Sequence, residues 1–453
     1  MDEDALYCVS PIDGRYRNST KRLRVYFSEY SLILYRIRIE IEYFIHLTTI
    51  LPELQNITDN DIINLRSIYA NYNNSICKKI KCIEQDINHD VKAIEYYIQE
   101  EFSNIGLSKY IPFIHFALTS NDINSIAINL SIKECVSVIL IPTIDDIIKK
   151  IMEKSTDWCN CVMLSHTHGQ PAVPTTMGKE LLVFSYRLNK QLSMLKEFKY
   201  FAKFGGAVGN LNGHLVAYPY IQWEKELDKF LETFNLKRDT LTTQIDNYEN
   251  ISTIFDNIKR INLILIDMCR DIWHYISINY FSQKLNYNEV GSSTMPHKVN
   301  PINFENSEGN LLLSNALLEF MSSKLPISRL QRDLTDSTVI RNIGSTIGHA
   351  FIGYNNIMFG LDKLEINNSK IQEDLNDNVQ VLVEAYQIIL KKHNYSGAYE
   401  LFKNLTRGQK NIRFSDLQNF INGLTVNKEI KKELLHVTIN NYIGISTEIS
   451  QIY

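Results

Sequence analysis

The sequence predicts an all-α fold built on long helices. Apolar residues recur at three- and four-residue spacing from Ile251 to Tyr275, which is the period of one buried helix face. No proline occurs between Pro219 and Pro296 or after Pro326, so both stretches can form long helices without interruption. Strand-like alternation is short and rare. Because striped helices bury their faces against one another, we expect a helix bundle.

Two further stretches show the same apolar period. Residues 123–151 form the first, and Pro142 within it should kink or break the helix. Residues 181–198 form the second, in a helix that should begin near Thr176. Changes in pattern near residues 110–112 and 362–368 are candidate domain boundaries. We therefore expect an N-terminal helical domain at 1–111, a central long-helix domain at 112–362 and a C-terminal helical domain at 363–453.

Composition excludes several classes of protein. The chain has 453 residues, of which 44% are hydrophobic and 22% charged, as in ordinary globular proteins. A net charge of −4 argues against general binding to nucleic acids or membrane surfaces. No uncharged apolar run of about 18 residues predicts a membrane span. The acidic start, residues 1–4, is unlike a secretory signal, and the odd number of cysteines favours free thiols in the cytoplasm.

The loop at residues 291–301 concentrates groups that can do chemistry. Its sequence is Gly-Ser-Ser-Thr-Met-Pro-His-Lys-Val-Asn-Pro, and its two prolines should give it a defined shape. Ser292 and Ser293 supply hydroxyls, while Lys298 and Asn300 supply a cation and an amide that can hold a carboxylate. Composition alone would be equally typical of a polar surface loop.

A second polar cluster spans residues 165–172 and contains His166 and His168. Two histidines at this spacing could bind a metal, but no third ligand is evident nearby. Gly169 and Pro171 should form a turn that aims one imidazole into a cleft. Histidine is well suited to deliver a proton near neutral pH, which makes a general acid the alternative interpretation.

A third cluster, Thr119 to Asp122, has the pattern of a helix start. Thr119 or Ser120 should be the N-cap residue, with Asp122 in the first turn. A capped helix N-terminus also presents N–H groups to an anion, so a binding role is compatible with capping.

Other polar clusters are weak signals when taken singly. A tight turn at residues 10–16 should display Arg15, and exposed arginines are usually only solvated. The rest are Asn88-His89-Asp90, the run from Arg329 to Asp333, and the run from Ser337 to Arg341.

Together these motifs resemble one family. The loop at 291–301, continuing through Asn306, and the Thr-His-Gly-Gln-Pro-Ala run at 167–172 resemble signatures of the fumarase/aspartase superfamily. The motifs at 10–16, 88–90 and 337–341 are similar to those of its adenylosuccinate lyase family. The resemblance extends from near residue 10 to at least residue 345, with a looser helical likeness beyond.

The resemblance implies a fold, a reaction and an assembly. We expect the three-domain superfamily fold, with its central long-helix bundle shared in a homotetramer. The implied reaction splits adenylosuccinate into AMP and fumarate, and the analogous succinyl-carboxamide ribonucleotide of purine synthesis should also be a substrate. The resemblance implies no metal or other cofactor, no nucleic-acid partner and no membrane.

The resemblance also implies roles for individual residues. Ser292 matches the catalytic base, on a mobile loop, and His168 matches the general acid. Lys298 and Asn300 match groups that hold the succinyl carboxylates, with Thr119 and Ser120 beside them. The rest of the implied substrate-binding set comprises Arg15, Tyr16, Asn88, His89, Asp90, Gln244, Ser293, Val299, Asn306, Arg332, Ser337, Thr338, Val339, Ile340 and Arg341.

The chain departs from the family pattern at two places. Relatives often have an arginine where this chain has His166, so either histidine could be the acid. After Gln244, the run Asp246-Asn247-Tyr248 lacks a basic residue that relatives often carry.

Three alternatives stay open at this point. A sister lyase, such as argininosuccinate lyase, is disfavoured by the motifs at Arg15 and at residues 337–341. A non-catalytic helical scaffold would be expected to lack Ser292, His168 or Lys298, and all three are present. A serine hydrolase would be expected to have a Gly-x-Ser-x-Gly elbow, which this chain lacks around Ser292.

Overall fold

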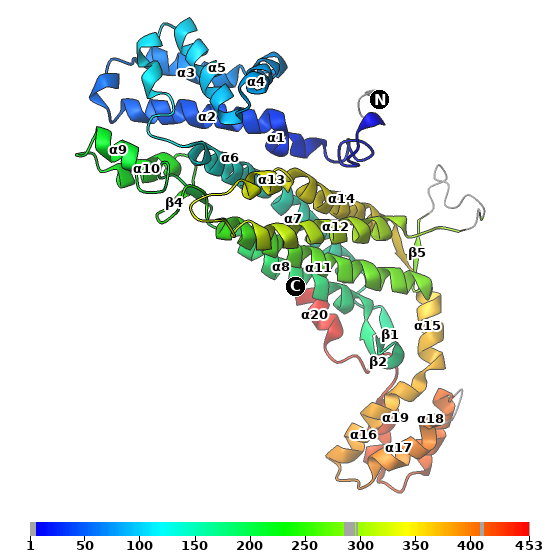
Figure 1. The fold of residues 1–453 in the computed structure, drawn as a ribbon. Coiled ribbons are helices and arrows are strands. Elements are labelled where there is room, and N and C mark those ends of the chain that lie inside the picture. Colours follow the sequence, from blue (N-terminus) through cyan, green and yellow to red (C-terminus); the bar gives the residue numbers. More distant parts are fainter. Residues whose placement is uncertain (1–5, 285–294, 296–297, 408–411, 453) are drawn as a thin grey trace. The chain divides into compact units, whose positions relative to one another are not determined.

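The structure is a computed structural model that describes residues 6–284, 295, 298–407 and 412–452. Within these ranges the chain is mostly helical, and its strands form three two-stranded sheets (Figure 1). The predicted all-α class is therefore confirmed. The chain divides into two compact units. The first unit comprises Met1–Ile144, Gln191–Leu263 and Asn310–Gly353, and the second comprises Asp145–Lys190, Ile264–Gly309 and Tyr354–Tyr453.

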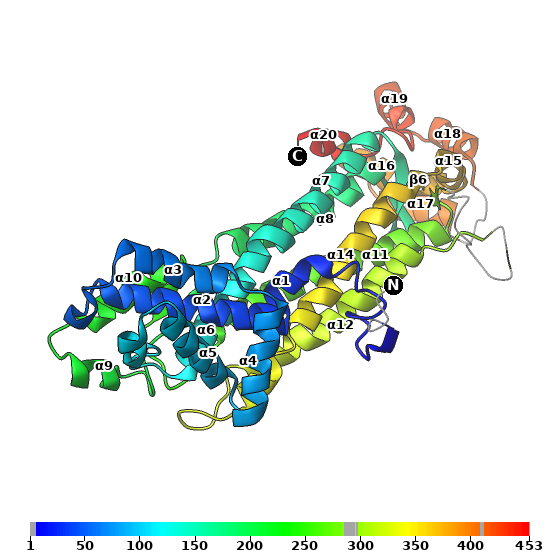
Figure 2. The same cartoon turned by 90° about the horizontal axis from the view of Figure 1, so that it is seen from above.

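The long helices predicted from apolar periodicity are present. The stripe from Ile251 to Tyr275 lies within α11, and Figure 2 shows α11, α12 and α14 running side by side. The stripe at 181–198 lies in α8, which ends two residues before Phe198. The boundary between the two units falls inside five long helices: α7 (Ile141–Asp157), α8 (Met177–Lys196), α11 (Glu249–Ser277), α12 (Ile302–Lys324) and α14 (Ile343–Lys363).

Pro142 is accommodated without a break. Helix α6 (Ser120–Cys135) continues through a π-helical turn, η5 (Val136–Leu140), directly into α7. Proline has no N–H to donate to the carbonyl four residues earlier, which would lie at Val138. The wider π turn ends at Leu140, and the N–H of Ile141, directly before Pro142, donates to the Val136 carbonyl. The predicted break at Pro142 is therefore wrong, and the structure has a π turn before the proline instead.

The first unit is organised around α2 (Glu29–Thr48), which contacts α3, α5 and α6. Aromatic side chains fill its core. The rings of Phe44 and Phe102 lie 4.8 Å apart, and those of Tyr43 and Phe204 lie 5.3 Å apart, both edge to face. The remaining elements of this unit are η2 (Lys21–Leu23), α1 (Arg24–Phe27), η3 (Pro52–Leu54), α3 (Asp59–Ala70), α4 (Asn74–Ile87), α5 (Asp90–Asn104), η4 (Ser108–Phe113), β3 (Phe201–Lys203), α9 (Asn212–Ala217), α10 (Trp223–Glu232), β4 (Lys237–Asp239) and α13 (Thr335–Ile340).

The second unit combines parts of the long helices with a hairpin and short C-terminal helices. Gly360 on α14 lets the helix approach Phe304 on α12, since a Cβ at Gly360 would lie 2.7 Å from the phenyl ring. The remaining elements of this unit are β1 (Val162–Thr167), β2 (Gln170–Thr176), β5 (Phe281–Gln283), β6 (Leu364–Ile366), α15 (Asn368–Asp377), η6 (Val379–Leu382), α16 (Val383–Lys392), α17 (Ala398–Thr406), α18 (Phe414–Gly423), α19 (Lys428–His436) and α20 (Ser446–Ile452).

The helix from Ser120 to Asp157 is, among the described residues, the one that is long and apolar enough to cross a membrane. Packing accounts for its apolar surface, because 56% of the apolar window is buried inside the protein. It also carries buried polar side chains, such as Asn129, that bond to other parts of the first unit. We therefore describe it as a buried core helix, which belongs to the first unit up to Ile144 and to the second unit from Asp145.

Candidate functional site

A pocket of about 500 Å³ in the first unit collects several of the predicted motifs. Its walls come from α2, from the junction of α4 and α5, from the start of α6, and from α13 with the residues before it. Of the predicted substrate-binding residues, those that line it are Asn88, His89, Asp90, Ser120, Arg332, Ser337, Thr338, Ile340 and Arg341. Motifs that are separated by up to about 250 residues of sequence therefore meet in one cavity.

The junction of α4 and α5 turns sharply at the pocket wall. Asn88 ends α4 in the left-handed region, with φ +53°, which asparagine tolerates better than most residues. His89 then caps α5, because its Nδ1 accepts a hydrogen bond of 3.1 Å from the N–H of Lys92. In the neutral imidazole, an accepting Nδ1 leaves the proton on Nε2. His89 is therefore oriented as a hydrogen-bond donor through Nε2.

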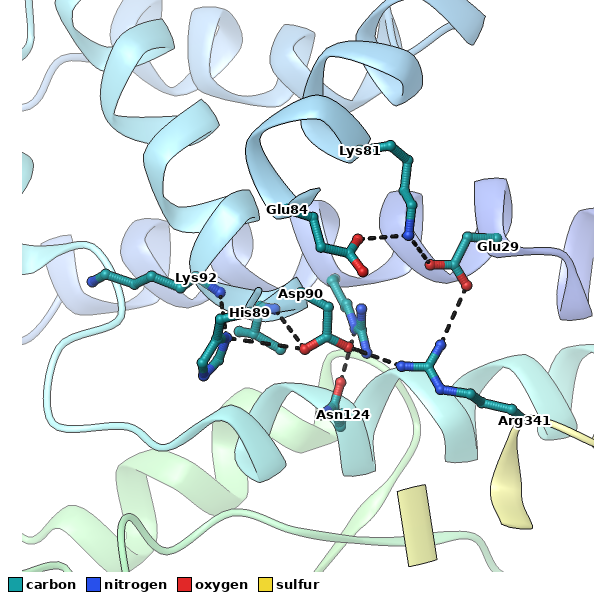
Figure 3. Close-up of polar contacts among 10 residues, drawn as sticks. Glu29, Lys81, Glu84, His89, Asp90, Lys92, Asn124 and Arg341 are labelled. Carbon is teal, nitrogen blue, oxygen red and sulfur yellow. Dashed lines mark hydrogen bonds and ion pairs between the residues drawn. The ribbon is translucent and has the colours of Figure 1, made fainter. Parts of the chain in front are cut away.

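Asp90 is the ionic centre of the pocket (Figure 3). Its Oδ2 lies 2.8 Å from Nη2 of Arg36 and 3.2 Å from Nη2 of Arg341, while its Oδ1 accepts from the N–H of Val91. Burial acts to raise the pKa of Asp90, but the charge of Arg36, together with these hydrogen bonds and Arg341, lowers it below its ordinary value. Asp90 is therefore a carboxylate with two cationic partners.

Arg36 fixes the position of Asp90 from the buried side of the pocket. It lies on α2, is only 3% exposed, and donates from Nε to Oδ1 of Asn124 at 2.8 Å. Asn124 is on the pocket-lining face of α6, so Arg36 ties Asp90 to that helix. Sequence reasoning missed Arg36, because it is one of several charged residues in a helical stretch far from the recognised motifs.

The N-terminus of α6 is fixed by a buried charge pair. Thr119 is the N-cap residue and Asp122 stands in the first turn, as predicted. The Thr119 N–H donates to Oδ2 of Asp122 at 2.8 Å. The other oxygen, Oδ1, accepts from Lys203 at 2.7 Å and from the N–H groups of Gly205 and Gly206. Desolvation lowers the pKa of Lys203 and the charge of Asp122 opposes this effect.

A second buried carboxylate, Asp246, anchors the segment after Gln244. It accepts from the hydroxyl of Ser125 at 2.6 Å and from the side-chain amide of Asn129 at 3.0 Å, both on α6. Its own N–H donates to Asn121. Burial raises the pKa of Asp246. Asp246, the first residue of the run 246–248, thus belongs to a structural network that holds α6.

Two further contacts link this segment to the motif before Arg341. Arg332 donates from Nη1 to Oε1 of Gln244 at 3.2 Å, so Gln244 contacts a residue of the pocket wall although it does not line the pocket itself. The hydroxyl of Tyr248 donates to Oδ2 of Asp336 at 2.8 Å. Tyr248 and Asp336 line the pocket, but neither is among the predicted binding residues, and Tyr248 was noted only within the run that departs from the family pattern.

Other predicted residues lie away from this pocket. The turn at residues 10–16 is formed, with the Tyr16 N–H donating to the Pro11 carbonyl, and it displays Arg15 as expected. Val339 is in α13 but is not among the lining residues. Ser292 and Ser293 lie outside the described residues. The remaining predicted binding residues, Lys298, Val299, Asn300 and Asn306, belong to the second unit.

His168 occupies the tip of the β1–β2 hairpin in the second unit. Thr167 pairs with Gln170, so His168 and Gly169 form a two-residue turn, with φ +52° and +71°. Positive φ at both positions is typical of a type I′ turn. The His168 side chain is exposed, whereas His166 is half-buried, and desolvation lowers the pKa of His166. Of the two histidines, His168 is therefore the more accessible to solvent.

Comparisons with known proteins agree with these motifs. Residues 14–315 match the family described as Lyase, and residues 328–443 match the family described as Adenylosuccinate lyase C-terminal. The chain is 50% identical to an adenylosuccinate lyase of Dictyostelium discoideum, over 97% of both chains. It is 42% identical to an adenylosuccinate lyase of Escherichia coli, over 98% of both chains.

This chain belongs to the adenylosuccinate lyase family. Solved structures extend the likeness at the level of the fold alone. A 3-carboxy-cis,cis-muconate lactonizing enzyme from Pseudomonas putida superposes with a TM-score of 0.74 at 14% identity, covering 95% of this chain and 96% of the other. A fumarate lyase from Mesorhizobium superposes with a TM-score of 0.73 at 14% identity, covering 95% and 97%. Family membership therefore rests on the sequence matches, and the solved structures support the all-α architecture.

Proposed function

We propose that this protein cleaves adenylosuccinate into AMP and fumarate by β-elimination. The observation that carries the proposal is the pocket of the first unit, which brings residues 88–90, Ser120, Arg332 and most of the motif at 337–341 together in one polar cavity. Its arginines and hydroxyl groups suit a nucleotide phosphate, and the adjacent α6 N-terminus suits a carboxylate. Membership of the adenylosuccinate lyase family gives the same substrate.

The charges of the substrate are matched by separate groups. In the proposal, Arg332, Ser337 and Arg341 surround the phosphate, while His89 donates from Nε2. Thr119 and Ser120 meet one succinyl carboxylate at the start of α6. The chain carries a net charge of −4, so these cationic groups must act locally.

The reaction removes a proton from the carbon next to a carboxylate and then releases the amine nitrogen. Ser292 is proposed as the base and His168 as the acid that protonates the nitrogen. Negative charge develops on the carboxylate beside the carbanion, where Lys298 and Asn300 are proposed to stabilise it. A serine hydroxyl is a poor base in water, so Ser292 requires exclusion of water and N–H groups that stabilise its anion.

The pocket wall supports a second substrate of the same kind. The succinyl-carboxamide ribonucleotide of purine synthesis carries the same phosphate, ribose and succinyl groups and differs in the base. Arg341, Ser337 and the α6 N-terminus contact only shared groups in the proposed arrangement. We therefore propose that both nucleotides are cleaved, in the cytoplasm, in the formation of AMP.

Assembly completes the proposal. We infer a homotetramer in which one site combines Thr119 and Ser120, His168, and Ser292 from three different chains. The exposed position of His168 on its hairpin suits such sharing, because a partner chain can cover it. The three-domain division at residues 111 and 362 stays a prediction.

Fumarate release tests the function directly. Purified protein is offered adenylosuccinate, the succinyl-carboxamide ribonucleotide and argininosuccinate in parallel, and fumarate is measured. Release from the first two alone is expected. Release from argininosuccinate alone would identify a sister lyase, and no release from any of the three would favour a scaffold.

A further inference from the structure

Arg341 is shared between two carboxylates at the pocket (Figure 3). Its Nη2 lies 3.2 Å from Oδ2 of Asp90, and its Nη1 lies 3.5 Å from Oε2 of Glu29. The Arg341 side chain is 48% exposed and lines the pocket, so a ligand can reach it. Glu29 is 40% exposed and does not line the pocket. Glu29 therefore touches the site through Arg341.

Each of these carboxylates has a second cation of its own. Asp90 retains Arg36, which is buried and lies at 2.8 Å. Glu29 retains Lys81, whose Nζ lies 3.0 Å from Oε1. If Arg341 turns toward a ligand, neither carboxylate loses its last cationic partner. The usual cost of leaving a charge uncompensated is thereby avoided.

Lys81 is itself held in place by a second acid. Its Nζ lies 2.6 Å from Oε2 of Glu84, one helical turn away on α4, and Glu84 lines the pocket. Burial acts to lower the pKa of Lys81, but Glu84 and Glu29 together raise it, so Lys81 remains a cation at neutral pH. The Glu84–Lys81–Glu29–Arg341–Asp90 chain is therefore a continuous row of alternating charges.

We propose that Glu29 is an affinity-determining residue, an internal counter-ion that competes with the phosphate of the substrate or product for Arg341. Lys81 compensates Glu29 when the phosphate takes Arg341. The inference rests on the proposed function, since it requires a nucleotide phosphate in this pocket. It adds two residues, Glu29 and Lys81, that the predicted site did not contain.

The geometry explains why the exchange favours a phosphate. The Glu29–Arg341 contact is the longer of the two and is exposed, and such pairs contribute little. A phosphate carries nearly two negative charges and can accept two parallel N–H bonds from a guanidinium. A ligand without that dianion cannot displace Glu29. The competition therefore lowers nucleotide affinity moderately, which favours release of the product.

The test compares variants of two neighbouring residues in the row. Binding of AMP and of adenosine is measured by titration calorimetry for the wild type, Glu29→Gln, Lys81→Met and the double variant. Glu29→Gln should bind AMP about threefold more tightly, in the range of exposed charge pairs. Lys81→Met should bind AMP about twofold more weakly. Without Lys81, Arg341 is the cationic partner that remains for Glu29, so the phosphate displaces Glu29 from Arg341 less readily. Adenosine affinity should not change in either variant.

The double variant distinguishes two explanations: the exchange of Arg341 between Glu29 and the phosphate, and a long-range electrostatic effect of each charge on AMP binding. If Lys81 acts through Glu29, Lys81→Met has no effect once Glu29 is Gln, whereas independent long-range fields would add. Glu100→Gln is the matched control, since Glu100 on α5 forms an exposed pair with Lys79, which lies on α4 as Lys81 does, outside the pocket. That variant should bind AMP as the wild type does. Ser28 still caps α2 in Glu29→Gln, so the variant should fold.

Two results would overturn the inference. One is unchanged or weaker AMP binding in Glu29→Gln, and the other is an equal gain in Glu100→Gln. Calorimetry needs no turnover, so the outcome is independent of the fumarate assay. If the wild type releases fumarate but Glu29→Gln binds AMP as the wild type does, the proposed function stands and this inference fails. A wild type that binds no AMP overturns the inference, and absence of fumarate release overturns the function.

Discussion

Lys203 and Asp122 form an ion pair of 2.7 Å in which neither side chain is exposed to solvent. The pair lies at the first turn of α6, and the other carboxylate oxygen of Asp122 accepts a hydrogen bond from the N–H of Thr119. Charge is expensive to bury, so a complete pair is required for either residue to remain inside the protein. The positions of Thr119 and Ser120 therefore depend on a lysine far from them in sequence.

Lys203→Met should strongly destabilise the first unit. Removing the cation leaves the Asp122 carboxylate buried and uncompensated, at a cost of about 3–5 kcal/mol. Lys229→Met is the control, because Lys229 forms a pair with Glu226 and is 61% exposed. It should change stability by less than about 0.5 kcal/mol. Urea unfolding at a fixed protein concentration measures both, and equal stabilities would contradict the expectation.

Ser292→Ala should bind substrate yet turn it over at least about a hundredfold more slowly, the usual scale for a positioned acid or base. The reason is its match to the family's base. Ser293→Ala, which alters the neighbouring hydroxyl, serves as the control and should retain much more activity. Rates of fumarate release, with AMP affinity measured separately, decide the matter. A near-normal rate for Ser292→Ala would point to Ser293 or His89 instead.

His168→Gln should be inactive, while His166→Gln should keep substantial activity. His168 is exposed at the hairpin turn, whereas His166 is half-buried on β1 with its ring 6.2 Å from that of Tyr280. Only the exposed imidazole can readily reach a substrate. Steady-state kinetics of the two variants provide the comparison. The reverse ranking would assign the acid to His166.

Complementation tests whether a site is shared among chains. Ser292→Ala and His168→Gln are mixed in equal amounts, dissociated and reassociated. If the two residues of a site come from different chains, about a quarter of the sites should regain both native residues under random mixing in closed symmetry. Recovery of about that fraction of activity supports the shared site. Mixed tetramers, confirmed by mass spectrometry, that remain inactive would place both residues on one chain.

Stability should depend on pH through His115. Its Nδ1 lies 2.6 Å from Oε1 of Glu40. Burial disfavours the charged imidazole, but the charge and hydrogen bond of Glu40 raise the pKa of His115 to about 9. A group whose pKa rises on folding stabilises the protein fully below its unfolded pKa, about 6.5, and loses that effect as pH rises through 9.

Between pH 6.5 and 9.5, the free energy of unfolding should therefore fall by on the order of 2 kcal/mol through this pair. Urea titrations at several pH values measure the fall. The double variant Glu40→Gln/His115→Gln controls for other titrating groups, since it retains them and lacks the pair. If wild type and double variant show the same pH dependence, the His115–Glu40 pair does not carry the effect.

Local pattern predicted much of this fold. Apolar spacing located α8 and α11, and the residue types at 119–122 located the start of α6. These features depend on neighbours within a few residues, so the sequence contains the necessary information. The sequence predicted that Pro142 would disturb the helix, because proline cannot donate a backbone hydrogen bond. It could not predict that the disturbance would be a π turn at Val136–Leu140.

The supporting residues of the pocket could not be predicted in the same way. Arg36 contacts Asp90 across 54 positions of sequence, and Tyr248 contacts Asp336 across 88. Neither pair has a recognisable spacing, since each depends on how distant helices pack. Asp90 and Arg341 were predicted because they belong to motifs that resemble those of a family. Their partners lie in helical stretches that carry no such motif.

The π turn in the helix from Ser120 to Asp157 makes chain length, as well as residue identity, a constraint. A π turn holds one residue more than an α turn, and each added or removed residue rotates the following helix by about 100°. Ser125 and Asn129 before the π turn and Ile144 and Ile147 after it are all buried, and the additional residue sets the rotation between these two parts of the helix. A gene lacking one codon between positions 136 and 140 would encode a regular helix with one of these two parts turned away from its partners. In this segment, a deletion would therefore be more damaging than most substitutions at the exposed Val138.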